Sequence, residues 1–182
     1  MLPIAFENLF RSDHESSEQL SPPSGFAFSP HGHFAITDDF NHRIQIYDGD
    51  KQLGSFGEKG KENGQFHYPK GIAVDKEGSI YIADSWNHRI QKFDSSGNFL
   101  SKWGSQGSGD GEFSQNPAQI DVDSLDNIYV TEGVRIHKFD SSGNLLATWS
   151  APSHYYIAVD SADHVLIGVL TPPRIRKYAS GN

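Results

Sequence analysis

Residues 71–100 read GIAVDKEGSIYIADSWNHRIQKFDSSGNFL, and this stretch decides the fold of the chain. Its runs at 79–83 and 89–93 are short and rich in β-branched and aromatic residues, which is typical of strands. The segments 75–78 and 94–97 begin with Asp and end with Gly, the chemistry of a type I turn between paired strands. The stretch therefore predicts three strands and the start of a fourth, with tight turns and one longer loop between them.

Three other parts of the chain repeat this stretch. Arg-Ile pairs begin at residues 43, 89, 135 and 174, at spacings of 46, 46 and 39 residues. The shorter last spacing reflects a shortened linker before the fourth unit. A period near 40 to 50 residues with several short strands per unit indicates a β-propeller, because helical repeats would place apolar residues at 3.6 spacing. The sequence thus predicts an all-β fold.

Composition narrows the classes of function. The 182 residues fit one domain, and a net charge of −8 argues against a nucleic-acid binder that relies on bulk positive charge. The chain has no cysteine, which excludes disulfides and zinc-thiolate sites. No window approaches 18 apolar residues, and the N-terminus lacks a basic region before an apolar run. We therefore expect neither a membrane span nor a signal peptide.

The motifs GQF (64–66), GIAVD (71–75), IYIAD (80–84) and NHRIQ (87–91) resemble an NHL repeat, the blade unit of a β-propeller family. The resemblance covers residues 25–182. It implies four-stranded blades at about 25–57, 71–104, 118–150 and 156–182. The third and fourth repeats depart from the motif, with GV (133–134) and PP (172–173) in place of Asn-His, so we expect differently shaped upper loops there.

The chain ends suggest how the propeller is completed. The fourth repeat stops where an outer strand would begin, and the chain opens with an apolar run within residues 3–10. We predict that this N-terminal strand completes the last blade of a single domain spanning 1–182. NHL-type propellers commonly have six blades, whereas this chain has four repeats. Three alternatives therefore stay open. They are a closed four-bladed ring, an open arc that self-associates with another copy through blade edges, and a fragment of a larger propeller.

Two kinds of polar residue recur near the upper loops. Asp39 with Arg43, and Asp84 with Arg89, flank equivalent loops and are interpreted as structural pairs, since ligand sites need asymmetry. Zinc requires three or four converging ligands, and only His31 and His33 are closely spaced histidines. The sequence also lacks catalytic-triad and phosphate-loop motifs. We therefore expect no cofactor, no metal and no enzymatic activity.

An aromatic and basic group is the candidate partner site. Phe40 and Trp86 precede Asn-His-Arg in exposed loops where a blade core needs no aromatic, although packing within the loop is the plainer explanation. His67, Tyr68 and Lys70 precede an inner strand and should rise on the same face. Aromatic residues dominate the anchors of protein interfaces. The leading hypothesis is a non-catalytic scaffold that binds a protein or peptide.

Two alternatives belong to other classes of protein. The family resemblance implies that partners, including RNA in some members, bind this face, and bases could stack on the exposed rings. The negative net charge makes RNA the weaker candidate. The other alternative is a channel enzyme similar to the peptide-amidating lyases, with a metal held by histidines.

Overall fold

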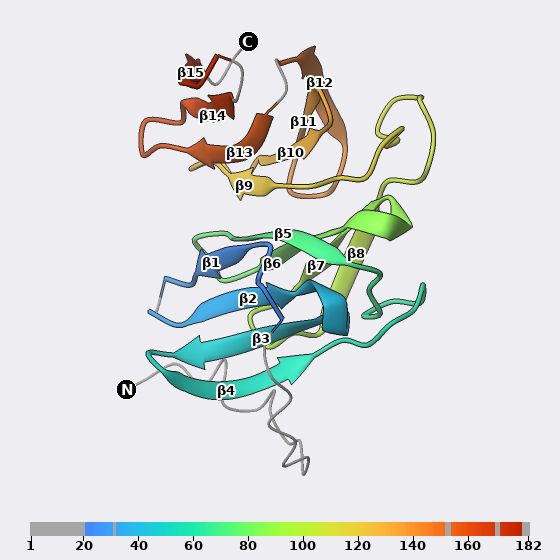
Figure 1. The fold of residues 1–182 in the computed structure, drawn as a ribbon, viewed down its shortest axis with the longest axis vertical. Coiled ribbons are helices and arrows are strands. Elements are labelled where there is room, and N and C mark those ends of the chain that lie inside the picture. Colours follow the sequence, from blue (N-terminus) through green and yellow to red (C-terminus); the bar gives the residue numbers. More distant parts are fainter. Residues whose placement is uncertain (1–20, 31, 152–153, 170–171, 180–182) are drawn as a thin grey trace.

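The computed structural model describes residues 21–30, 32–151, 154–169 and 172–179, and it places four antiparallel sheets in succession along the chain (Figure 1). Blade one contains β1 (Phe26–Phe28), β2 (Phe34–Asp38), β3 (Arg43–Asp48) and β4 (Lys51–Phe56), and blade two contains β5 (Pro69–Val74), β6 (Ile80–Asp84), β7 (Arg89–Phe93) and β8 (Phe99–Trp103). Blade three contains β9 (Ile120–Val122), β10 (Ile128–Glu132), β11 (Arg135–Phe139) and β12 (Leu145–Ser150), and blade four contains β13 (His154–Val159), β14 (Val165–Val169) and β15 (Arg174–Tyr178). The predicted all-β, four-bladed β-propeller is confirmed. The strand expected from residues 3–10 lies outside the described residues.

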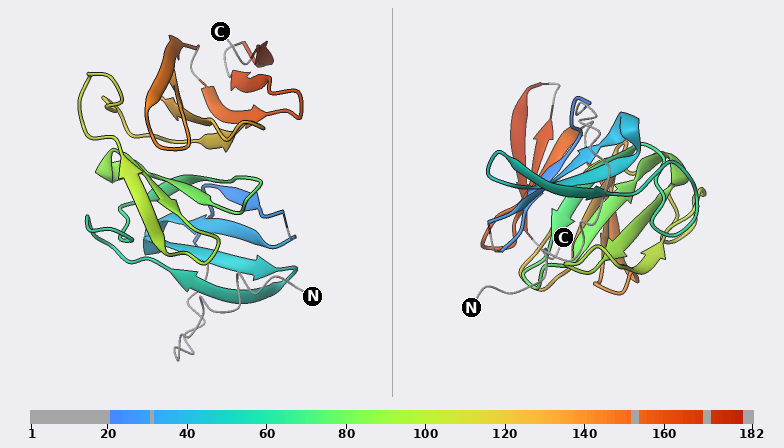
Figure 2. Two further views of the ribbon diagram at one scale, coloured as in Figure 1. Left: turned by 180° about the vertical axis from the view of Figure 1, so that it is seen from behind. Right: turned by 90° about the horizontal axis from the view of Figure 1, so that it is seen from below.

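The blades are arranged with their first strands innermost. In Figure 1, β1, β5, β9 and β13 lie toward the middle of the molecule, whereas β4, β12 and β15 lie toward its periphery. Figure 2 shows from behind that blade one lies beside blade two, and that blade three lies beside blade four. Loops that connect second to third strands lie on one side of the blades, called here the upper face.

The tight turns form as their sequence predicts. In blade two, the Asp75 carboxylate accepts hydrogen bonds from the backbone N–H groups of Glu77 and Ser79, at 3.0 and 2.8 Å. The Gly78 N–H then donates to the Asp75 carbonyl at 3.0 Å, with Gly78 at a φ of +89° that a side chain would disfavour. The same carboxylate-to-backbone bonds recur at Asp94, Asp123, Asp140 and Asp160. The Asp94 and Asp140 turns also end in glycine, whereas the Asp123 and Asp160 turns end in Asp126 and Asp163, at φ values of +62° and +61°. The leading aspartate is therefore the residue that all of these turns share.

The hydrophobic core lies between blades and not within them. Three apolar layers separate blades one and two, two and three, and three and four. Loop residues Phe66 and Phe113 are fully buried in the first and second layers. A Cβ at Gly57 or at Gly104 would lie 2.5 Å from the corresponding phenylalanine ring, so each linker needs glycine where it passes over its ring.

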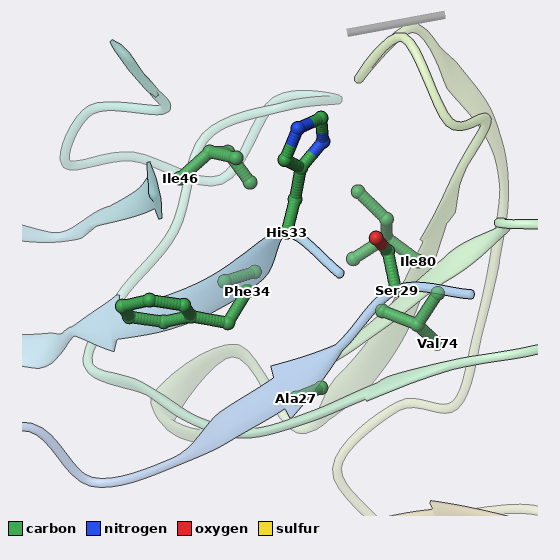
Figure 3. A pocket seen from close by; sticks show the side chains of 8 residues that line it. Ala27, Ser29, His33, Phe34, Ile46, Val74 and Ile80 are labelled. Carbon is green, nitrogen blue, oxygen red and sulfur yellow. The ribbon is translucent and has the colours of Figure 1, made fainter. Parts of the chain in front are cut away.

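Blade one lacks one polar contact that blades two and three share. The Tyr81 hydroxyl donates to Asp75 at 3.1 Å, and the Tyr129 hydroxyl donates to Asp123 at 3.0 Å. Blade one has Ala35 at the tyrosine position and Ser29 at the aspartate position, as the repeat alignment shows. A cavity of about 10 Å³ is left between these residues and His33, Ile46 and Ile80 (Figure 3). A cavity of this size has room for about one water molecule at most, so it is a packing defect and not a ligand site.

Candidate functional site

Two short 3-10 turns form the upper loops of blades one and two: η1 (Asp39–Asn41) and η2 (Ser85–Asn87). In blade two, the buried Asp84 carboxylate accepts hydrogen bonds from Arg89 Nε at 2.6 Å and from Asn87 Nδ2 at 2.9 Å. Gln91 Nε2 adds another at 3.1 Å. One carboxylate thereby fixes both the start and the end of the loop.

Blade one has the same arrangement, but with a different aspartate from the predicted one. Arg43 Nε donates to Asp38 at 2.8 Å, so the prediction that Asp39 pairs with Arg43 is wrong. The 46-residue period places Asp38, not Asp39, at the position of Asp84. Asp39 instead accepts a hydrogen bond from Ser24 Oγ at 2.6 Å, which fastens the segment before β1 to the upper loop.

The central residue of each turn is left pointing to solvent. Phe40 is 62% exposed and Trp86 is 54% exposed, although both are large and apolar. Their neighbours Asn41 and Asn87 are bonded to the buried carboxylates, so the turn cannot rotate the ring inward without breaking those bonds. Exposed rings at both positions are therefore a consequence of the loop geometry that the two blades share.

Five rings pack together where the loops of blades one and two meet, and we call them the upper aromatic cluster: Phe40, His42, His67, Tyr68 and Trp86. Tyr68 is central, with ring centroids at 4.7 Å from His42, 5.0 Å from Trp86 and 5.8 Å from Phe40. His67 lies 5.2 Å from Trp86 and 5.6 Å from His42. The structure thus brings together four of the five predicted partner-site residues and adds His42.

The backbone beneath the cluster is strained and tightly bonded. Tyr68 has a φ of +52°, which is uncommon for a bulky residue. Its N–H donates to His42 Nδ1 at 3.0 Å, while the N–H of His67 donates to Asp84 Oδ1 at 2.7 Å. The Trp86 N–H donates to the His67 carbonyl at 3.0 Å. Strain of this kind persists only where surrounding contacts over-determine it, and it gathers at functional sites.

His42 is held as a neutral acceptor in this arrangement. Burial lowers the pKa of His42, and electrostatic interactions with Lys59 and His67 lower it further, whereas Asp39 and Asp84 act in the opposite direction. A neutral ring leaves Nδ1 free to accept the Tyr68 N–H. The cluster is therefore assembled in its bonded form at neutral pH.

Lys70 does not join the cluster. It lies on β5 with a partly exposed side chain, and its carbonyl accepts a hydrogen bond from Thr37 Oγ1 at 2.6 Å. Among the described residues, no hydrogen bond or ion pair links its ammonium group to the five rings. The basic part of the predicted site is thus separate from the aromatic part.

The upper loop of blade three is different. Glu132 takes the place of Asp84, and only Gly133 and Val134 separate it from Arg135. The Glu132 carboxylate accepts from Arg135 at 2.9 Å and contacts His137 Nε2 at 2.7 Å. No aromatic residue stands on this loop, so blade three does not repeat the aromatic residues of the upper loops of blades one and two.

The central channel is a second concave feature. Inner strands of all four blades line a cavity of about 390 Å³. Its polar groups bond to other parts of the chain: Asp121 accepts from the Val159 N–H at 2.7 Å, and Gln119 Nε2 donates to the Ser24 carbonyl at 3.4 Å. Burial raises the pKa of Asp121, and its two backbone hydrogen bonds oppose that effect. These residues connect blades to one another.

The histidines and carboxylates of the described part of the chain do not converge on a metal site. There, no three His, Cys, Asp or Glu side chains are grouped so that they could hold a metal ion. Of the two closely spaced histidines, His33 borders the small cavity of Figure 3, and His31 lies outside the described residues. No helix in the described ranges is long and apolar enough to cross a membrane.

The comparisons with known proteins identify the repeat. Residues 66–93 match the family model of the NHL repeat. These residues are an NHL repeat. The NHL repeat begins at the buried Phe66 and ends with β7, so it carries Tyr68 and Trp86 of the aromatic cluster. No curated protein sequence matches the chain.

Solved structures share the fold at low identity. A virginiamycin B lyase from Staphylococcus aureus aligns with a TM-score of 0.61 and 16% identity, over 85% of this chain and 54% of that one. A gluconolactonase from Xanthomonas campestris aligns with a TM-score of 0.63 and 17% identity, over 84% and 55%. The WD40 β-propeller domain of Doa1 aligns with a TM-score of 0.61 and 16% identity, over 83% and 48%. The chain spans about half the length of these structures, and the likeness shows the fold alone.

Proposed function

We propose that this propeller is a non-catalytic interaction module that binds a protein or peptide through the upper aromatic cluster. The observation that carries the proposal is the combination of two largely exposed rings, Phe40 and Trp86, with a backbone that holds them in place. Interface anchors are enriched in Trp and Tyr that stay rigid on binding, because little side-chain entropy is then lost.

The asymmetry between blades supports the same proposal. A ring needed for blade packing would recur at each junction, yet blade three folds with Gly133 and Val134 in the corresponding loop. The structural part of the loop, a buried carboxylate bonded to arginine, is present in blades one, two and three. Exposed aromatic residues are the part that varies, as expected of a surface that selects a partner.

A selection from random peptides tests the proposal with an unbiased set of binding sequences. The peptides would be displayed on phage and selected on the immobilised chain, and the affinity of a selected peptide measured by fluorescence anisotropy. We expect Trp86→Ala to weaken binding about 30-fold, the effect of losing a hot spot worth about 2 kcal/mol. Leu125→Ala is the matched control, because Leu125 is 75% exposed but lies in a turn of blade three, outside the cluster.

Two outcomes would overturn the proposal. One is that no peptide is selected. The other is that selected peptides bind Trp86→Ala and Leu125→Ala equally well, which would place the binding surface elsewhere. Mixed-sequence single-stranded RNA at low salt serves as a second probe. Tight, salt-sensitive RNA binding that requires Trp86 would favour the RNA-binding alternative instead.

A further inference from the structure

The two end blades expose positions that the middle blades bury. We call the side of a blade that faces the preceding blade its leading face. In blade one this face consists of five apolar residues: Phe26, Phe28, Phe34, Ile36 and Tyr47. Strand register aligns them with Ile72, Val74, Ile80, Ile82 and Phe93 of blade two, all of which pack in the first apolar layer. Phe26 is 68% exposed, whereas the aligned Ile72 is 4% exposed; Phe28 is 64% exposed, whereas the aligned Val74 is partly buried.

The opposite side of blade four is exposed in the same way. We call it the trailing face, and it contains Ala158, Leu166 and Ile175. Ile175 aligns with Ile44, Ile90 and Ile136, which are all 0% exposed, yet Ile175 itself is 75% exposed. A ring in which blade four packed on blade one of the same chain would bury both faces, as every other junction does.

The two exposed faces are complementary in size. At the junction of blades two and three, the trailing face presents the large Tyr81, and the leading face presents Val122 and Ile128. At the free ends this distribution is reversed. Leu166 stands at the tyrosine position of the trailing face, and Phe28 and Phe34 stand at the valine and isoleucine positions of the leading face. Large side chains on one face would thereby meet a smaller one on the other face, as they do in the filled layer.

The leading face is also ordered in advance. Phe26 and Phe28 meet edge to face with ring centroids 5.9 Å apart, Phe28 and Phe34 are 5.9 Å apart, and Phe34 stacks on Tyr47 at 5.2 Å. A contiguous row of rings, two of them largely exposed, marks an association surface.

We propose that the trailing face of blade four packs on the leading face of blade one from a second copy of this chain. Two copies related by a two-fold axis along the channel would form two identical junctions and a closed ring of eight blades, within the range known for propellers. The chain aligns with 54% and 55% of the length of two solved propellers, so a second copy docked on its end blades would extend the arc of blades toward a closed ring. This inference is independent of the proposed function of the upper face.

Mass in solution tests this proposal with two matched variants. Light scattering after size exclusion, at a low and a high protein concentration, should give the parent chain twice the 20.2 kDa of one copy. Phe28→Glu alters only the leading face and Ile175→Glu only the trailing face, and each should yield a monomer with an unchanged far-UV circular dichroism spectrum. Leu125→Glu, at a position 75% exposed on neither face, should remain a dimer.

Mixing the two variants makes the test specific for head-to-tail contact. Phe28→Glu retains an intact trailing face and Ile175→Glu retains an intact leading face, so a mixture should recover one junction and the mass of a dimer. A parent chain that is monomeric at the high concentration would overturn the proposal. Dissociation by only one of the two variants would overturn it as well, because that result indicates like faces pairing with each other.

Discussion

The upper loops of blades two and three begin and end at matching strand positions but present different surfaces. Asp84 and Arg89 enclose four residues in blade two, and Glu132 and Arg135 enclose two in blade three. Both blades nevertheless have the carboxylate–arginine bond. In blade three, a longer acidic side chain makes this bond across a shorter loop. The buried polar network therefore maintains the blade, whereas the exposed residues above it are free to differ and to carry a function.

Removing the network carboxylate should give the largest effect on stability. Asp84→Ala and Glu132→Ala should each lower the free energy of unfolding by about 3–5 kcal/mol, because each leaves buried donors, including an arginine, without their acceptor. Urea denaturation measures this loss. If one of the two variants were nearly as stable as the parent, the networks of blades two and three would not be equivalent.

The short loop of blade three should depend on its glycine. Gly133 has a φ of +57°, and a Cβ there would lie 2.5 Å from Gln115 Oε1. We expect Gly133→Ala to cost about 1–2 kcal/mol, the penalty for a side chain in the left-handed region. Gly64→Ala is a reference for the part of this loss that comes from backbone conformation alone. Gly64 has a φ of +80°, and no atom lies within 4 Å of its Cβ position. Equal losses in both variants would mean that the Gln115 contact contributes nothing.

The histidine in the blade-three network should add a pH dependence that the blade-two network lacks. Burial lowers the pKa of His137, although its hydrogen bond to Glu132 opposes this. As the pH falls through the ordinary histidine value of 6.5, the unfolded chain binds a proton at this residue before the folded chain does, so stability decreases. His137→Gln installs the residue that blade two has at this position, and it should lose less stability than the parent between neutral and mildly acidic pH. Parallel pH profiles of the two proteins in urea denaturation would contradict this assignment.

The smallest effect on stability is expected from the exposed ring. Trp86→Ala should change the free energy of unfolding by about 1 kcal/mol or less, because the side chain is largely exposed and contributes only ring contacts to the fold. Thermal unfolding followed by circular dichroism measures this. A loss comparable to that of Asp84→Ala would mean that Trp86 is part of the structural network.

Much of this fold could be predicted from the sequence because its determinants are local and repeated. The Asp-first turns and alternating apolar runs act within one blade, and repetition makes their register visible. The choice between Asp38 and Asp39 could also have been made, because counting back 46 residues from Asp84 leads to Asp38. The adjacent aspartates concealed this, and the error shows that register is a stronger guide than residue type.

Other features had no signal in the sequence. The bond from the Tyr68 N–H to His42 Nδ1 joins residues from two blades and depends on a backbone at positive φ. His42 therefore appeared only as the second letter of the Asn-His-Arg motif. The Glu132–His137 contact was equally hidden, because it needs both a shorter loop and the replacement of glutamine at a buried position. Such contacts depend on how neighbouring blades pack, which a single repeat does not encode.

The three tryptophans can serve as internal reporters of where a peptide binds. Trp86 is 54% exposed, whereas the indole nitrogens of Trp103 and Trp149 are buried. In a ¹⁵N–¹H correlation spectrum, with the Trp86 signal assigned from Trp86→Phe, a selected peptide would be added in steps. We predict that the Trp86 indole signal shifts while the signals of Trp103 and Trp149 stay in place. A peptide that binds and leaves the Trp86 signal unmoved would show that the upper aromatic cluster is not the binding surface.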